Sequence, residues 1–146
     1  MAQASSDKPL RSSSVAPAQG RKKRAVAFDT SFLMAVMEHP TPWSEDITDS
    51  VGGFTPVVLS SVRDELARLA AKGDGNGRFA ALALEMLKQG AFKLEPDGNG
   101  KPDDEIVSFA LREGAAVATI DSELAKSLKA SRVQTVITLR GGRVST

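Results

Sequence analysis

Short apolar runs alternate with segments of helical spacing from Ala25 to the end of the chain. The run AVAF at 25–28 is unbroken and ends at Asp29, which is typical of a strand buried on both faces. Four similar runs follow, so the predicted strands cover residues 25–28, 54–60, 91–95, 115–120 and 133–139. The segments between them predict helices over residues 30–38, 43–51, 61–71, 78–90, 103–114 and 122–130.

Helices that separate successive strands imply crossover connections between parallel strands. This pattern predicts an α/β fold with three layers, α/β/α, around a mainly parallel sheet of about five strands. Ser61 is expected to cap the helix over 61–71, with Asp64 at the reciprocal capping position. The glycine-rich stretch 73–77 is expected to be a flexible turn between two helices.

The composition narrows the available chemistry to carboxylates. A length of 146 residues with 41% hydrophobic and 25% charged residues indicates one globular domain. The absence of cysteine excludes disulfides, thiolate zinc sites and a cysteine nucleophile, and it favours a reducing, cytoplasmic location. A single histidine, His39, argues against a Ser-His-Asp triad or a multi-histidine metal site. No apolar run approaches the roughly 18 residues of a membrane span, so no membrane contact is expected.

The charge of the chain is unevenly distributed. The first 24 residues carry six basic side chains and one acidic one, so with a net charge of +1 the remainder carries −4. Residues 1–23 are expected to be a disordered basic tail, and residues 24–146 a folded domain. The basic cluster Arg21, Lys22, Lys23 and Arg24 is either a solvated flank or an arm that binds nucleic-acid phosphates.

Five acidic residues are expected at one edge of the sheet. Asp29 and Asp121 each follow a strand, whereas Glu65, Asp103 and Asp104 lie in first helical turns. Individually they also have structural explanations: Asp121 as a helix cap, the others as a solvated face or as favourable charges near a helix N-terminus. Together they would repel, by about 3 kcal/mol per pair at 5 Å and an effective dielectric constant of 20. An all-oxygen cluster of this kind suits Mg²⁺ or Mn²⁺.

The sequence resembles the PIN-domain family of metal-dependent ribonucleases, which includes small archaeal and bacterial toxins and rRNA-processing enzymes. The resemblance covers about residues 25–140 and is carried by FDTSFLM (28–34), SSVRDELARL (60–69), PDDEIVSFA (102–110) and VATIDSELAKSLK (117–129). It implies the strand order 3-2-1-4-5. It also implies catalytic residues Asp29, Glu65, Asp103 and Asp121, metal ligands Asp29, Asp121 and either or both of Asp103 and Asp104, and supporting hydroxyls at Thr30 and Thr119.

The resemblance further implies an activity and partners. The expected reaction is Mg²⁺- or Mn²⁺-dependent hydrolysis of phosphodiester bonds in single-stranded RNA, such as rRNA or tRNA, by water that the ion activates. A homodimer is expected, and so is an antitoxin partner if the chain is a toxin. The alternative is a non-catalytic RNA-binding or scaffold protein of ribosomal RNA processing. Trp43 is a candidate for base stacking, or else a rim or dimer-contact aromatic.

Overall fold

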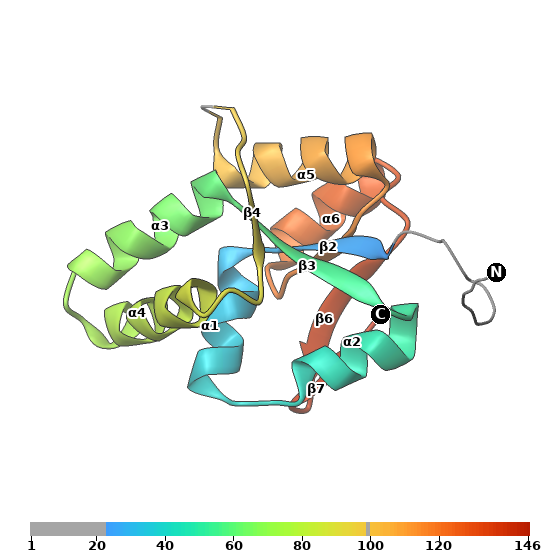
Figure 1. Cartoon of the computed structure of the whole chain (residues 1–146). Coiled ribbons are helices and arrows are strands. Elements are labelled where there is room, and N and C mark those ends of the chain that lie inside the picture. The colour runs from blue at the N-terminus through green and yellow to red at the C-terminus, as the bar shows by residue number, and fades with distance from the viewer. Residues whose placement is uncertain (1–22, 99) are drawn as a thin grey trace, which may run out of the picture.

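A computed structural model describes residues 23–98 and 100–146, so Arg21, Lys22 and nearly all of the predicted tail lie outside the described residues. The described chain forms one six-stranded sheet in the order β4-β3-β2-β5-β6-β7 (Figure 1). The strands are β2 (Arg24–Phe28), β3 (Phe54–Leu59), β4 (Lys93–Glu95), β5 (Ala116–Ala118), β6 (Val136–Arg140) and β7 (Arg143–Ser145). The helices are α1 (Thr30–Glu38), α2 (Trp43–Val51), α3 (Ser60–Ala71), α4 (Gly75–Lys88), α5 (Pro102–Glu113) and α6 (Ser122–Ala130).

The first five strands confirm the predicted parallel order, with β2 at the centre between β3 and β5. The chain passes outward from β2 through β3 to β4 and then returns to β5 and β6 on the other side. Right-handed crossovers therefore place α1, α3 and α4 on one face and α5 and α6 on the other. No helix in the described part of the chain is long and apolar enough to cross a membrane.

The sequence predicted α1, α2 and α6 with their observed bounds, but it missed two features. The last strand pairs with an antiparallel sixth strand, β7, through a tight turn at Gly141 and Gly142. Residues 75–77 are not part of a flexible turn but form the first turn of α4, because Asp74 accepts a hydrogen bond from the Gly77 amide at 2.8 Å. A side chain at Gly77 would meet the Leu69 carbonyl oxygen of α3 at 2.8 Å, so glycine permits the close packing of these two helices.

Phe28, at the end of β2, is the centre of an aromatic cluster in the core. Its ring lies edge-on to Trp43 and to Phe92, with centroids 5.3 and 5.2 Å apart. Phe32 packs against the same ring at 5.5 Å. Trp43 is therefore a partly buried ring that packs against the core through Phe28 and Phe92.

Asp46 of α2 fastens the edge hairpin to the body of the domain. Arg143 donates to both carboxylate oxygens of Asp46, from Nε at 2.9 Å and from Nη2 at 2.6 Å. The Val144 amide adds a third hydrogen bond at 3.1 Å. These contacts, the Arg143 hydrogen bonds foremost, lower the pKa of Asp46 to about 2. The hairpin therefore depends on an ionised carboxylate that is only 7% exposed.

We expect Asp46→Asn to lower the melting temperature at pH 7, because the amide cannot accept both guanidinium hydrogen bonds. The folded-state pKa of about 2 lies below the ordinary 3.8, so this stabilisation is complete above pH 4 and is lost as the pH falls towards 2. Thermal unfolding of the wild type and the variant between pH 7 and pH 2 measures the difference. A difference that stays constant down to pH 2 would contradict the role of the ionised pair.

Candidate functional site

Asp29 and Asp121 follow neighbouring parallel strands at the carboxyl edge of the sheet. Phe28 of β2 pairs with Ala118 of β5, and the Asp29 amide donates to the Ala118 carbonyl at 2.9 Å. This pairing brings Asp29 next to Thr119 and places Asp121 two residues further along. The carboxyl edge of a parallel sheet is where α/β proteins commonly bind ligands.

Asp29 is buried but well supplied with hydrogen bonds. It is 4% exposed, and its Oδ2 accepts from Ser31 Oγ at 2.6 Å and from Thr119 Oγ1 at 2.8 Å. Burial raises the pKa of Asp29 above its ordinary value, while these hydroxyls and the backbone amides of Thr30 and Ser31 counteract part of that effect. The hydroxyls therefore stabilise a charge that burial disfavours.

The same two hydroxyls shape the turn that carries Asp121. Ser31 Oγ accepts from the Ile120 amide at 3.1 Å, and Thr119 Oγ1 accepts from the Asp121 amide at 3.0 Å. Ser31 Oγ and Thr119 Oγ1 lie 3.2 Å apart, and each directs its one hydrogen at Asp29. Sequence reasoning selected Thr119 but missed Ser31, although a hydroxyl two residues after an aspartate at a helix start is a signal for such a contact.

Thr30 supports Asp29 only through its backbone amide, whereas its side chain holds Glu65. Its hydroxyl donates to Glu65 Oε1 at 2.6 Å, which joins the start of α1 to the first part of α3. Thr30 is 7% exposed, so this hydrogen bond fixes one oxygen of Glu65 from the protein interior. Glu65 is thereby oriented at the same edge as Asp29.

Asp103 lies where the other acids meet. Burial raises the pKa of Asp103 most, and the negative charges of Asp29, Asp121, Glu65 and Asp104 raise it further, in that order. Asp103 and Asp104 both lie in the first turn of α5. Asp103 is thus within electrostatic range of the other four acids that sequence reasoning selected.

Asp121 also has a structural task, the helix cap expected as its alternative explanation. Its Oδ1 accepts from the amides of Glu123 at 2.9 Å and Leu124 at 3.3 Å. A carboxylate has two oxygens, so capping through Oδ1 leaves Oδ2 available for another partner. The capping explanation and a ligand role are therefore compatible at this residue.

The donor set suits a hard divalent cation, although its members are not drawn tightly together. Within residues 23–98 and 100–146, no three histidine or acidic side chains are already grouped closely enough to hold one metal ion. Mg²⁺ commonly keeps several waters and takes only one or two carboxylates directly. An all-oxygen set whose charges raise the pKa of Asp103 fits such an ion, with the remaining acids contacting it through water.

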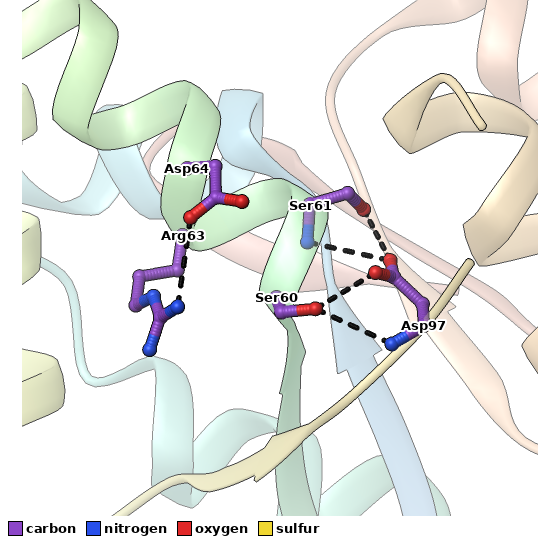
Figure 2. A network of polar contacts seen from close by, with 5 residues as sticks. All are labelled: Ser60, Ser61, Arg63, Asp64 and Asp97. Atoms are coloured by element: carbon purple, nitrogen blue, oxygen red, sulfur yellow. Dashed lines mark hydrogen bonds and ion pairs between the residues drawn. The ribbon is translucent and has the colours of Figure 1, made fainter. Parts of the chain in front are cut away.

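A loop carboxylate, Asp97, caps α3 from outside the helix (Figure 2). Helix α3 follows β3 without a connecting loop, so its N-cap position is Leu59, which has no side-chain acceptor. Asp97 accepts from Ser60 Oγ at 2.8 Å, from the Ser61 amide at 3.3 Å and from the Ser61 hydroxyl. The prediction of Ser61 as the cap is wrong, because Ser61 already lies in the first helical turn.

The predicted reciprocal cap at Asp64 is also wrong, since Asp64 pairs with Arg63 at 3.5 Å on the outer side of the helix (Figure 2). Asp97 escaped sequence reasoning because it lies 36 residues from Ser61 in the chain. Its loop leads into α5, so Asp97 joins the helix that carries Glu65 to the approach to Asp103.

The two described basic residues of the predicted cluster, Lys23 and Arg24, lie away from the acids. Arg24 begins β2 and Asp29 follows its end, so about 16 Å of extended chain separates them at roughly 3.3 Å per residue. Lys23 precedes Arg24 and is exposed. The two described members of the cluster are therefore at the amino edge of the sheet, opposite the acidic edge.

We expect Asp103→Asn to raise the melting temperature by about 1–3 °C at pH 7 with EDTA present, because relieved repulsion of a few tenths of a kcal/mol shifts a domain of this size by that amount. Because the pKa of Asp103 is raised in the folded state, the gain should vanish below about pH 3.8, where Asp103 is protonated in both states. Asp104→Asn is the matched control, since it removes the same favourable charge from the N-terminus of α5. Equal melting temperatures for the two variants would contradict the central position of Asp103.

We expect Asp97→Ala to destabilise the domain by about 1 kcal/mol, the usual cost of losing a helix cap. Asp64→Ala tests the alternative cap and should change stability by less than about 0.5 kcal/mol, as an exposed pair does. Urea unfolding of both variants measures the difference. A larger loss for Asp64→Ala would restore the capping scheme expected from sequence.

Comparisons with known proteins give a family match over most of the described residues. A family model described as a PIN like domain matches residues 26–142. A search of curated proteins finds no match.

Three solved structures are similar in fold. The PIN domain endonuclease Utp24 is 20% identical with a TM-score of 0.70, covering 82% of this chain and 88% of that one. A domain of a functionally unknown protein from Methanocaldococcus jannaschii DSM 2661 is 18% identical with a TM-score of 0.60, covering 84% and 96%. VapBC2 from Rickettsia felis, bound to a DNA fragment from its promoter, is 14% identical with a TM-score of 0.61, covering 80% and 99%. Because the family model matches most of the chain, residues 26–142, and that range includes every acid of the site, the chain belongs to the PIN-like domain family.

Proposed function

We propose that this protein is a divalent-metal-dependent endoribonuclease that hydrolyses phosphodiester bonds of single-stranded RNA. Membership of the PIN-like domain family supports a nuclease role in general. The observation that carries the metal-dependent proposal is the position of Asp29 and Asp121 after two paired parallel strands, with Asp103 near enough for their charges to raise its pKa. A site that gathers so much negative charge at a ligand-binding edge needs a cation when all its acids are ionised.

Asp29, Asp103 and Asp121 are the proposed ligands of Mg²⁺ or Mn²⁺, with Asp104 available in the same turn as Asp103. When bound, such an ion supplies Lewis-acid stabilisation of the charge that develops on the phosphate oxygens. Asp29 is held in one orientation by Ser31 and Thr119, so its ligand geometry is set before substrate binds. The chain's own contribution is therefore a rigid set of oxygen donors.

Glu65 is the proposed residue that orients the attacking water. Thr30 occupies its Oε1, and its Oε2 is then free to accept a hydrogen bond from water. In the hydrolysis, the water oxygen forms a bond to phosphorus, and Glu65 receives the proton from the water. The bond from phosphorus to the bridging ester oxygen breaks, and that oxygen takes a proton from solvent and leaves as a hydroxyl of the cleaved strand. A fixed acceptor of this kind lowers the cost of placing the nucleophile.

Two observations favour a second candidate, a non-catalytic RNA-binding or scaffold protein. Asp121 caps α6, and among the described side chains no three acids are already grouped around one ion position.

In the nuclease proposal the chain acts in the cytoplasm on rRNA or tRNA, either as an RNA-processing enzyme or as a toxin held by an antitoxin. We also propose that the chain forms a homodimer and, if it is a toxin, that it binds an antitoxin.

We expect the wild type to cleave a labelled single-stranded RNA with Mg²⁺ or Mn²⁺ and to lose this activity in EDTA. Asp29→Asn and Asp121→Asn should each reduce the cleavage rate by about 100-fold or more, because a metal ligand contributes several kcal/mol of charge stabilisation and each 1.36 kcal/mol is tenfold in rate. Glu85→Gln, at an exposed acid of α4, is the control and should cleave normally.

The scaffold candidate predicts a different set of results. A wild type that binds RNA, cleaves none with either metal, and shows no change in melting temperature on addition of Mn²⁺ would overturn the nuclease proposal. Cleavage that survives in both aspartate variants would show that the activity belongs to a contaminant or to another site.

A further inference from the structure

A groove runs beside α6 and β6 and reaches the amino end of β2. It encloses about 750 Å³, and Asp121 lies at one end while Arg24 and Gln134 lie towards the other. We name it the α6–β6 groove. Its walls come from elements that are separate from α3 and α5, which carry Glu65 and Asp103. The groove is therefore an extension of the acidic site in one direction only, from Asp121 towards the opposite edge of the sheet.

The walls of the groove follow from the periodicity of each element. Val136, Thr138 and Arg140 alternate along β6, so they project from one face of the strand. Ala125 and Lys129 of α6 are four residues apart and lie on one stripe of the helix. A strand face and a helix stripe thus form a continuous channel, with Arg140 near the acidic edge and Lys129 near the opposite one.

The charge of the groove opposes the charge of the domain. Three basic side chains line it, Arg24, Lys129 and Arg140, and the single acid is Asp121 at its end. Within the described ranges, none of the three basic residues forms an ion pair, since the pairs found there involve other residues. The chain after residue 24 carries a net charge of −4. The groove has the opposite sign of charge, because its three basic side chains outnumber its one acid. Such a reversal attracts an extended anion.

We propose that the α6–β6 groove binds the phosphodiester backbone of single-stranded RNA and leads it to the acidic edge at Asp121. Hydroxyls of Thr135 and Thr138 in the same groove can donate to phosphate or to the ribose 2′-hydroxyl. The binding role stands without the proposed nuclease activity, whereas the direction of the strand rests on it.

The location of Arg24 connects this groove with the basic cluster in the sequence. Arg24 is the last residue of that cluster and lines the groove at the end far from Asp121. One RNA strand in the groove would therefore contact basic side chains at one edge of the sheet and reach the acids at the other, because the groove spans the distance between them.

The test measures RNA affinity in the absence of metal and of cleavage. Fluorescence anisotropy with a labelled single-stranded 12-nucleotide RNA is recorded in EDTA over a range of salt concentrations. The chain carries Asp29→Asn in every sample. The variant is Lys129→Ala with Arg140→Ala, and both residues are exposed, so the fold should be retained. The matched control is Lys72→Ala with Lys88→Ala, which removes two exposed charges outside the groove.

We expect the groove variant to bind RNA about tenfold more weakly than the control. Its slope of log affinity against log salt should fall by about 1.4, because each lost phosphate contact on a single strand removes about 0.7. The proposal would be overturned if the groove variant had the same RNA affinity and the same salt slope as the chain with both residues intact. It would also be overturned if the control variant lost as much RNA affinity as the groove variant.

A second measurement separates this inference from the nuclease proposal. If the chain with Asp29 intact cleaves RNA, Lys129→Ala alone should raise KM and leave kcat unchanged, since Lys129 lies near the edge opposite the acids and its loss removes binding remote from the reacting phosphate. If that chain cleaves nothing, the nuclease proposal fails while the affinity loss still supports the groove.

Discussion

Repulsion among carboxylates at one edge of a parallel sheet is the constraint on which the rest of the structure depends. This repulsion is seen at Asp103, because burial and then the charges of four other acids raise the pKa of its carboxyl group. Charges of one sign separate unless the surrounding structure holds them. Hydroxyl groups of other elements hold Asp29 and Glu65, and the first amides of α6 hold Asp121. Three of the acids are therefore fixed by hydrogen bonds.

Hydroxyl groups provide most of those contacts. Ser31 and Thr119 bind Asp29 and also the backbone of the turn that carries Asp121. Thr30 holds Glu65 from the start of α1. Hydroxyl donors stabilise carboxylates without adding charge of their own, so they fix geometry and leave the negative potential in place for a cation. Asp97 contributes at a greater distance by holding the N-terminus of α3 against the loop before α5.

The opposite sign of charge is placed along the α6–β6 groove. Its basic residues come from β2, α6 and β6, and in the sheet β5 lies between β2 and β6. An anionic strand lying there would meet positive charge along its length and the acids only at one end. Such a division allows one domain with a small net charge to attract both a polyanion and a cation.

The sequence by itself determined the α/β class and the mainly parallel sheet, because apolar runs and helical spacing are local signals, whereas the strand order followed from the resemblance to the PIN-domain family. Asp29 and Asp121 could be paired from sequence since parallel strands all end at the same edge. Only the tertiary structure decided which groups hold those acids, where the basic residues lie and which residue caps α3. Ser61 was selected as a cap by its position in the chain, yet the cap is Asp97, because a carboxylate brought in by folding can bind amides that no local side chain reaches.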